Sequence, residues 1–137
     1  MLTLKTKHLG NLRTEITHLQ SGGKMTTDAP VDNNGKGEFI SPTDMVAGAL
    51  GSCMLTLMEM AATRMDLDMT GTILDITKVM AADPRRIAEI RIDVWFPFAA
   101  DEKSRTILQR AADTCPVSKS LHPDLRQVVS FHYREEE

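Results

Sequence analysis

The chain has 137 residues, of which 42% are hydrophobic and 26% charged, and its formal net charge is -3. This length suits one domain, predicted to span residues 1–137, and the composition excludes an intrinsically disordered chain. The slightly acidic balance excludes the basic surface that nucleic-acid-binding proteins need, so we expect no nucleic-acid partner.

The N-terminal part of the chain predicts strands and not a leader, because residues Met1–Gly10 lack the long apolar run of a signal peptide. Partial alternation of residue types, interrupted by turn residues at positions 10–11 and 21–23, is typical of short antiparallel strands. The predicted strands span Leu2–His8, Leu12–Leu19 and Lys24–Thr27. The segment Asp28–Gly37 is rich in Gly, Asn, Asp and Pro, and predicts an exposed loop.

A long helix is predicted next, because Ser41 is a good N-cap, Pro42 fits the first helical position and Asp44 can answer the cap. The polar positions that follow are spaced by three and four residues, as in a single polar stripe. They are Ser52, Thr56, Glu59, Thr63 and Asp66. A stripe this narrow predicts a helix buried on most of its circumference. A chain this short buries such a helix poorly alone, so we expect a homodimer.

The same helix raises the question of a membrane span, since Met45–Ala62 is an apolar run at the lower length limit of about 18 residues. Because the run carries Ser52, Thr56 and Glu59, we interpret it as a buried helix and expect no membrane partner. Gly48 and Gly51 lower helix propensity and indicate a close helix contact or a bend.

The second half of the chain predicts two strands, two helices and a last strand. Residues Ile87–Phe96 alternate cleanly, with Ile90, Ile92, Val94 and Phe96 on one face. The other predicted elements are a strand over Thr70–Met80, an amphipathic helix over Asp101–Asp113, a short helix over Pro116–Leu121 and a strand over Gln127–Tyr133. Strands, a long helix, a hairpin, helices and a strand indicate an α+β fold and not a nucleotide-binding βαβ fold.

Two cysteines are the candidate chemical groups. Cys115 lies at a predicted helix N-cap, where backbone N–H groups favour the thiolate, although a small buried residue at a helix start is the alternative. Cys53 lies at the edge of the polar stripe, and a buried small hydrophobe is its alternative. With no export signal, we expect a cytoplasmic protein whose two thiols are reduced at rest.

The sequence offers no support for a metal or a bound cofactor. The two cysteines form neither a CxxC motif nor a zinc knuckle, and their spacing with a histidine gives no zinc pattern. His122 is more consistent with a surface histidine than with a Cys/His catalytic pair. The nine methionines are interpreted as core filler and not as ligands.

Two segments together resemble the OsmC/Ohr family. SPTDMVAGALGSC, residues 41–53, is similar to the first cysteine motif of that family, and CPVSKSL, residues 115–121, is similar to the second. Both occur in the family's order, with a hairpin and a helix between them, and the order of predicted elements matches over the whole chain.

The resemblance implies an intertwined homodimer in which antiparallel sheets wrap long central apolar helices, with active sites at the subunit interface. It implies an oxidative-stress peroxidase that reduces organic hydroperoxides and, less efficiently, hydrogen peroxide. Cys53 would attack the peroxide and become a sulfenic acid, and Cys115 would close a disulfide that a dithiol reductant, lipoyl or a small thiol, reopens. It implies no cofactor.

The chain departs from the family pattern near the reactive cysteine. Well-characterised members pair that cysteine with an arginine from the N-terminal strands and a glutamate at the helix start. Here Thr43 and Asp44 occupy the helix start, and Arg13 is the nearest arginine. Asp44 either replaces the glutamate or only caps the helix, and Arg13 either supports Cys53 or faces water beside Glu15.

Two other functions remain open. The first is a non-catalytic or redox-sensing dimer that binds a small apolar ligand at its interface, with ligand binding that survives Cys→Ser changes. The second is a different thiol-transfer enzyme that handles sulfur or persulfide.

Overall fold

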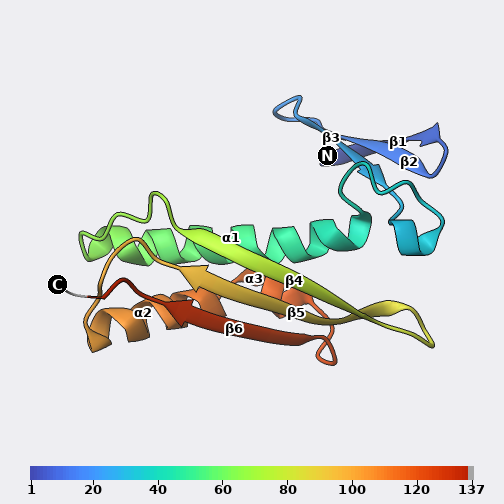
Figure 1. Cartoon of the computed structure of the whole chain (residues 1–137). Helices are drawn as coiled ribbons and strands as arrows, with labels where there is room; N and C mark the ends of the chain where they lie inside the picture. The colour runs from blue at the N-terminus through green and yellow to red at the C-terminus, as the bar shows by residue number, and fades with distance from the viewer. Residues whose placement is uncertain (136–137) are drawn as a thin grey trace. The chain divides into compact units, whose positions relative to one another are not determined.

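A computed structural model describes residues 1–135, and its contacts divide the chain into two compact units, residues 1–46 and 47–137. The α+β class predicted from the sequence is confirmed (Figure 1). The strands are β1 (Leu4–Gly10), β2 (Arg13–His18), β3 (Lys24–Asp28), β4 (Ile73–Ala81), β5 (Arg86–Trp95) and β6 (Arg126–His132). The helices are η1 (Val31–Asn33), α1 (Pro42–Arg64), α2 (Glu102–Asp113) and α3 (Pro116–Ser120).

The first unit is an antiparallel sheet in the order β1-β2-β3. The predicted strands are found with shifted ends, and the predicted exposed loop contains the single turn η1. The register puts uncharged side chains and two histidines on one face of the sheet and most of its charges on the other. The uncharged face carries Leu4, Thr6, His8, Thr14, Ile16, His18, Met25 and Thr27.

This sheet lacks a hydrophobic core of its own within the described residues. The buried hydrophobic side chains of the structure all lie between Ala47 and Cys115. In the first unit Leu4 is 50% exposed and Met25 is 46% exposed, although both lie on the uncharged face. A three-stranded sheet needs such a face covered to be stable in water.

Helix α1 begins with the predicted reciprocal cap. The Asp44 N–H donates to Ser41 Oγ at 3.0 Å, and the Ser41 N–H donates to Asp44 Oδ2 at 3.1 Å. The predicted polar stripe is exposed, while Leu50, Met54 and Met58 on the opposite face are at most 3% exposed. The predicted polar stripe is therefore confirmed, whereas burial of most of the helix circumference is not reached within one chain.

By length and composition α1 is apolar enough to cross a membrane, and 39% of its most apolar window is buried within the chain. The core helix of a globular protein meets the same criteria. The buried part of α1 packs on the second sheet, where a Cβ added at Gly51 would lie only 2.6 Å from Ile76 Cδ1. Gly51 therefore marks the close contact that its place in the helix predicted.

The second unit contains a sheet in the order β4-β5-β6 (Figure 1). β4 and β5 form the predicted antiparallel hairpin, whereas β6 pairs with β5 in parallel. Ile90, Ile92 and Val94 of β5 are at most 1% exposed, so the predicted inner face of this strand is confirmed. Glu89 on the opposite face of this strand is also buried, at 7% exposed, and Arg91 and Arg126 pair with its carboxylate.

Candidate active site

The structure brings the two cysteines together within the second unit. Cys53 lies on α1, and Cys115 is the N-cap of α3. Both are free thiols, and Cys53 lies close enough to Cys115 to raise the pKa of the Cys115 thiol. The two cysteines are therefore neighbours in space although 62 residues apart in the sequence.

The two thiols differ in exposure. Cys115 is completely buried, with 0% of its surface exposed, whereas Cys53 is half-buried at the edge of the exposed polar stripe of α1. Cys53 is therefore the more exposed of the two cysteines. Among the described residues, Cys53 is the one other thiol with which Cys115 can form a disulfide.

Cys115 has the predicted capping geometry, and opposing effects act on the pKa of its thiol. The Ser118 N–H donates to Cys115 Sγ at 3.4 Å, and the Val117 N–H is a second backbone donor. Burial nevertheless raises the pKa of the Cys115 thiol, the contact with Cys53 raises it further, and the two donors offset only part of this effect. The cap donors therefore act in the expected direction, toward the thiolate, but desolvation of the buried sulfur outweighs them and the net pKa is raised.

Ser118 and Gln127 connect the cysteine cap to the sheet. The Ser118 hydroxyl donates to Gln127 Oε1, and Gln127 Nε2 donates back to the Ser118 carbonyl at 3.2 Å. The pair joins α3 to β6. The sequence singled out neither residue in this role, because their nine-residue separation carries no recognisable motif.

Arg13, the predicted supporting arginine, lies in the first unit, which the structure describes separately from the cysteines. Its guanidinium binds both carboxylate oxygens of Asp28, with Nη2 to Oδ2 at 2.9 Å and Nε to Oδ1 at 3.3 Å. Glu38 accepts a further bond at 3.3 Å, and the Phe39 ring lies 4.7 Å from the guanidinium carbon. Asp28 and Glu38 were not predicted as partners of this arginine, since both fall in or beside a predicted loop.

Asp44 and Thr43 surround the start of α1. Asp44 caps the helix, which was one of the two roles expected for it, and the Thr43 hydroxyl lies 3.3 Å from the Ser41 hydroxyl.

His122 is exposed and accepts a hydrogen bond from the Asp124 N–H, as expected for a surface histidine. Among residues 1–135, no three His, Cys, Asp or Glu side chains are grouped to hold a metal ion.

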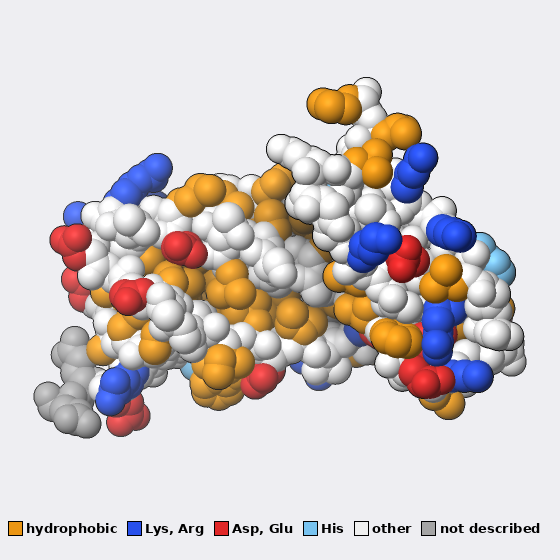
Figure 2. Space-filling view, turned by 90° about the horizontal axis from the view of Figure 1, so that it is seen from above, with side chains coloured by type: hydrophobic (Ala, Val, Ile, Leu, Met, Phe, Trp, Pro, Cys, Tyr) orange, Lys and Arg blue, Asp and Glu red, His pale blue; other side chains and the backbone are white. Residues whose placement is uncertain are grey.

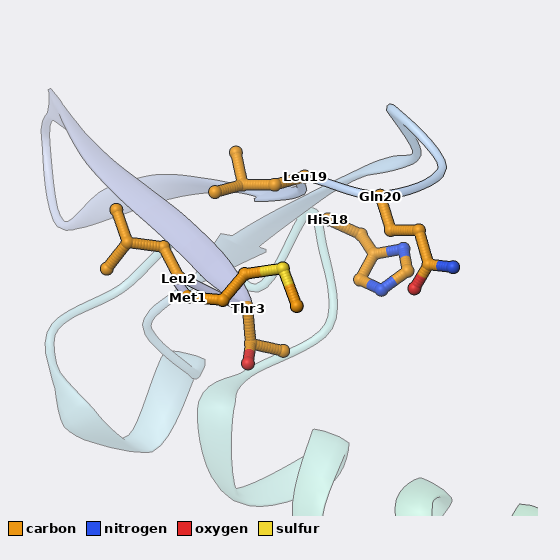
Figure 3. A pocket seen from close by; sticks show the side chains of 6 residues that line it. All are labelled: Met1, Leu2, Thr3, His18, Leu19 and Gln20. Carbon is orange, nitrogen blue, oxygen red and sulfur yellow. The ribbon is translucent and has the colours of Figure 1, made fainter.

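A separate pocket of about 630 Å³ lies in the first unit (Figure 3). Its lining residues are Met1, Leu2, Thr3, His18, Leu19 and Gln20. The lining is mainly apolar and contains no thiol, so the redox chemistry of the cysteines does not extend to it.

Comparisons with known proteins agree with the fold. The profile of the family described as OsmC-like protein matches residues 35–127. A crystal structure from Psychrobacter arcticus, of a protein named for osmotic stress induction and a detoxification response, is 51% identical over 96% of each chain, with a TM-score of 0.93. No curated protein matches the sequence.

More distant structures share the fold alone. An organic hydroperoxide resistance protein OsmC from Legionella pneumophila is 13% identical, with a TM-score of 0.75 over 96% of this chain and 97% of that one. An organic hydroperoxide resistance protein from Elizabethkingia anophelis, with crystallant-derived thiocyanate bound, is 11% identical, with a TM-score of 0.76 over 98% of each chain.

Proposed function

The chain belongs to the OsmC-like protein family, and from this premise we propose that it is a thiol peroxidase that reduces organic hydroperoxides and, more weakly, hydrogen peroxide. Family membership associates the chain with a peroxide-related stress response. The observation that carries the proposal is the contact between a half-buried and a fully buried cysteine.

The difference in exposure supports a division of roles. Cys53 is the more exposed of the two cysteines, so we assign it the first attack on the hydroperoxide. Cys115 is buried, and its raised pKa keeps it protonated at neutral pH, which suits a thiol that waits for a modified neighbour. The same roles follow from the resemblance of residues 41–53 and 115–121 to the two family motifs.

The chemical cycle balances without a cofactor. The Cys53 thiolate attacks the peroxide O–O bond, and with one proton it yields an alcohol and Cys53 sulfenic acid. Cys115 then loses its proton and attacks the sulfenic sulfur as the thiolate, the hydroxyl leaves with that proton as water, and the Cys53–Cys115 disulfide forms. A dithiol, either a lipoyl group or a small thiol, reduces this disulfide and restores both thiols.

Arg13 stays the proposed tuning residue for Cys53, in the role that the resemblance implies for it. Its two carboxylate partners, Asp28 and Glu38, supply the acidic support that the family draws from a glutamate at the helix start. Thr43 occupies the position of that glutamate, and we propose that Asp44 serves the cap and not Arg13.

We also propose a homodimer in the cytoplasm. The uncharged face of the first sheet and the exposed apolar side chains visible in Figure 2 support a second copy as the covering partner. A compartment that keeps thiols reduced would hold both cysteines ready for the cycle. Nucleic acid and membrane are not proposed as partners, given the net charge of -3 and the buried face of α1.

The test is turnover of cumene hydroperoxide and hydrogen peroxide with a dithiol reductant, for wild type, Cys53→Ser and Cys115→Ser. We expect Cys53→Ser to be inactive and Cys115→Ser to stall after one equivalent, with sulfinic acid detected by mass spectrometry. A wild type no faster than free thiol would refute the peroxidase and favour the ligand-binding or sulfur-transfer alternatives.

A further inference from the structure

Ser118 and Gln127 hold helix α3, and with it Cys115, through hydrogen bonds. α3 has five residues, and a helix this short is unstable without external contacts. Ser118 makes three of the contacts of this helix, through its N–H to Cys115 Sγ, its hydroxyl to Gln127 Oε1 and its carbonyl to Gln127 Nε2. One residue therefore joins the cysteine sulfur to strand β6.

Disulfide closure is sensitive to this placement. An S–S bond forms at about 2.05 Å with a narrow range of dihedral angles, so the Cys115 sulfur must approach Cys53 along a defined direction. Attack also requires the thiolate of Cys115, and the Ser118 N–H is one of two backbone donors that stabilise this charge in a buried site.

We propose that Ser118 and Gln127 are positioning residues that set the rate at which Cys115 resolves a modified Cys53. Their hydrogen bonds join Cys115, Ser118 and Gln127, and they act by holding the Cys115 cap against β6. This inference rests on the proposed two-cysteine cycle and names the residues that control its second step.

The step can be measured without peroxide by using an aromatic disulfide, 5,5′-dithiobis(2-nitrobenzoate). Cys53 reacts first, releases one thionitrobenzoate and keeps the other half as a mixed disulfide. Cys115, which is 0% exposed, then attacks the Cys53 sulfur, forms the protein disulfide and releases the second thionitrobenzoate. The two releases report Cys53 and Cys115 separately in one absorbance trace.

Gln127→Met keeps the length of the side chain and removes both of its hydrogen bonds, and Ser118→Ala removes the hydroxyl bond alone. We expect the second release to slow on the order of tenfold in Gln127→Met and severalfold in Ser118→Ala, as expected for loss of two and one hydrogen bonds. Ser118→Thr retains the hydroxyl and should restore the wild-type rate. Ser120→Ala is the matched control, because within residues 1–135 the Ser120 hydroxyl donates to the Pro116 carbonyl on the same helix.

A structural role alone would slow both releases together or lower the melting temperature of every variant. The positioning role is overturned if the second release keeps its wild-type rate in Gln127→Met, or if Ser120→Ala slows it equally. If Gln127→Met does not fold, the comparison of Ser118→Ala with Ser118→Thr decides the question in the same way.

The assay also separates this inference from the proposed function. A wild type that completes both releases but does not turn over hydroperoxides would refute the peroxidase and leave the positioning role intact. A wild type that turns over peroxide while its variants all resolve equally fast would refute only the positioning role.

Discussion

Cys115 shows how two opposite effects act on one sulfur atom. Backbone N–H donors from Ser118 and Val117 favour the thiolate, whereas burial and the Cys53 neighbour favour the thiol, and the net effect is a raised pKa. The sequence revealed the donors, because an N-cap is a local feature. Burial to 0% exposure is set by tertiary packing, which no local sequence pattern reports.

This balance predicts the pH dependence of resolution. Because only the thiolate attacks and the pKa of Cys115 is raised, the second release of the aromatic thiol should accelerate about tenfold per pH unit from pH 7 to pH 9. The measurement is a pH jump on the preformed Cys53 mixed disulfide. A rate that stays level above pH 7 would mean that Cys115 is already ionised and would contradict the raised pKa.

Asp28 has a buried carboxylate that binds two other residues of the first unit. Its carboxylate is 0% exposed, binds Arg13 through both oxygens and accepts the Glu38 N–H at 3.1 Å. The hydrogen bond from Arg13 is the main reason that the pKa of Asp28 lies below its ordinary value. A lowered pKa means that the ionised form is favoured by folding, so its stabilisation is present above the ordinary aspartate pKa and is lost as pH falls through the lowered value.

We therefore expect Asp28→Asn to melt several degrees below wild type at pH 7, and to lose less stability than wild type between pH 4 and pH 2. Thermal unfolding followed by circular dichroism measures both. Asp124→Asn is the matched control, since the Asp124 side chain is 87% exposed and its loss should leave the midpoint unchanged. Identical pH profiles for wild type and Asp28→Asn would show that the ion pair contributes nothing.

At the scale of elements, α1 contains two glycines in different surroundings. A Cβ at Gly48 would meet nothing within 4 Å, whereas one at Gly51 would meet Ile76 at 2.6 Å and Leu74 at 3.1 Å. Alanine in a helix interior is favoured over glycine by about 1 kcal/mol. Crowding in a packed core costs roughly 1–3 kcal/mol.

Gly48→Ala should therefore raise the free energy of unfolding by about 1 kcal/mol, while Gly51→Ala should gain nothing or lose stability. Urea unfolding at one fixed protein concentration compares the two variants directly. Equal gains for both would mean that the side chains of β4 move aside without cost, and that Gly51 is not required for the contact between α1 and β4.

At the scale of the whole molecule, the first unit has no hydrophobic core of its own within the described residues. It contributes no buried hydrophobic residue to the core, and its sheet has one face that carries only uncharged side chains and histidines. A sheet of this kind is stable only when another surface covers that face. A second copy of the chain is the proposed cover.

We expect light scattering to give twice the chain mass of 15.2 kDa, and the melting temperature to rise with protein concentration. Ile16→Asp places a charge on the uncharged face and should dissociate or unfold the protein. Thr17→Asp places the same charge on the opposite face, beside Lys5 and Lys24, and should leave the mass unchanged. A monomer that stays folded at micromolar concentration would contradict the proposed dimer.

The sequence by itself determined the elements whose signals are local. The Ser41–Asp44 cap, the exposed polar stripe of α1 and the buried face of β5 all depend on residues within a few positions of one another. The motifs of residues 41–53 and 115–121 determined the family for a similar reason, since each is a short contiguous pattern.

Only the tertiary structure decided which residues far apart in the sequence come into contact and how far solvent is excluded from them. The pairs that it brought together are Cys53 with Cys115, Gln127 with Ser118, and Asp28 with Arg13. These contacts depend on the register of the strands and the packing of the helices. The acidity of Cys115 followed from the same cause. Desolvation depends on every neighbour of a buried atom, and most of those neighbours lie far away along the chain.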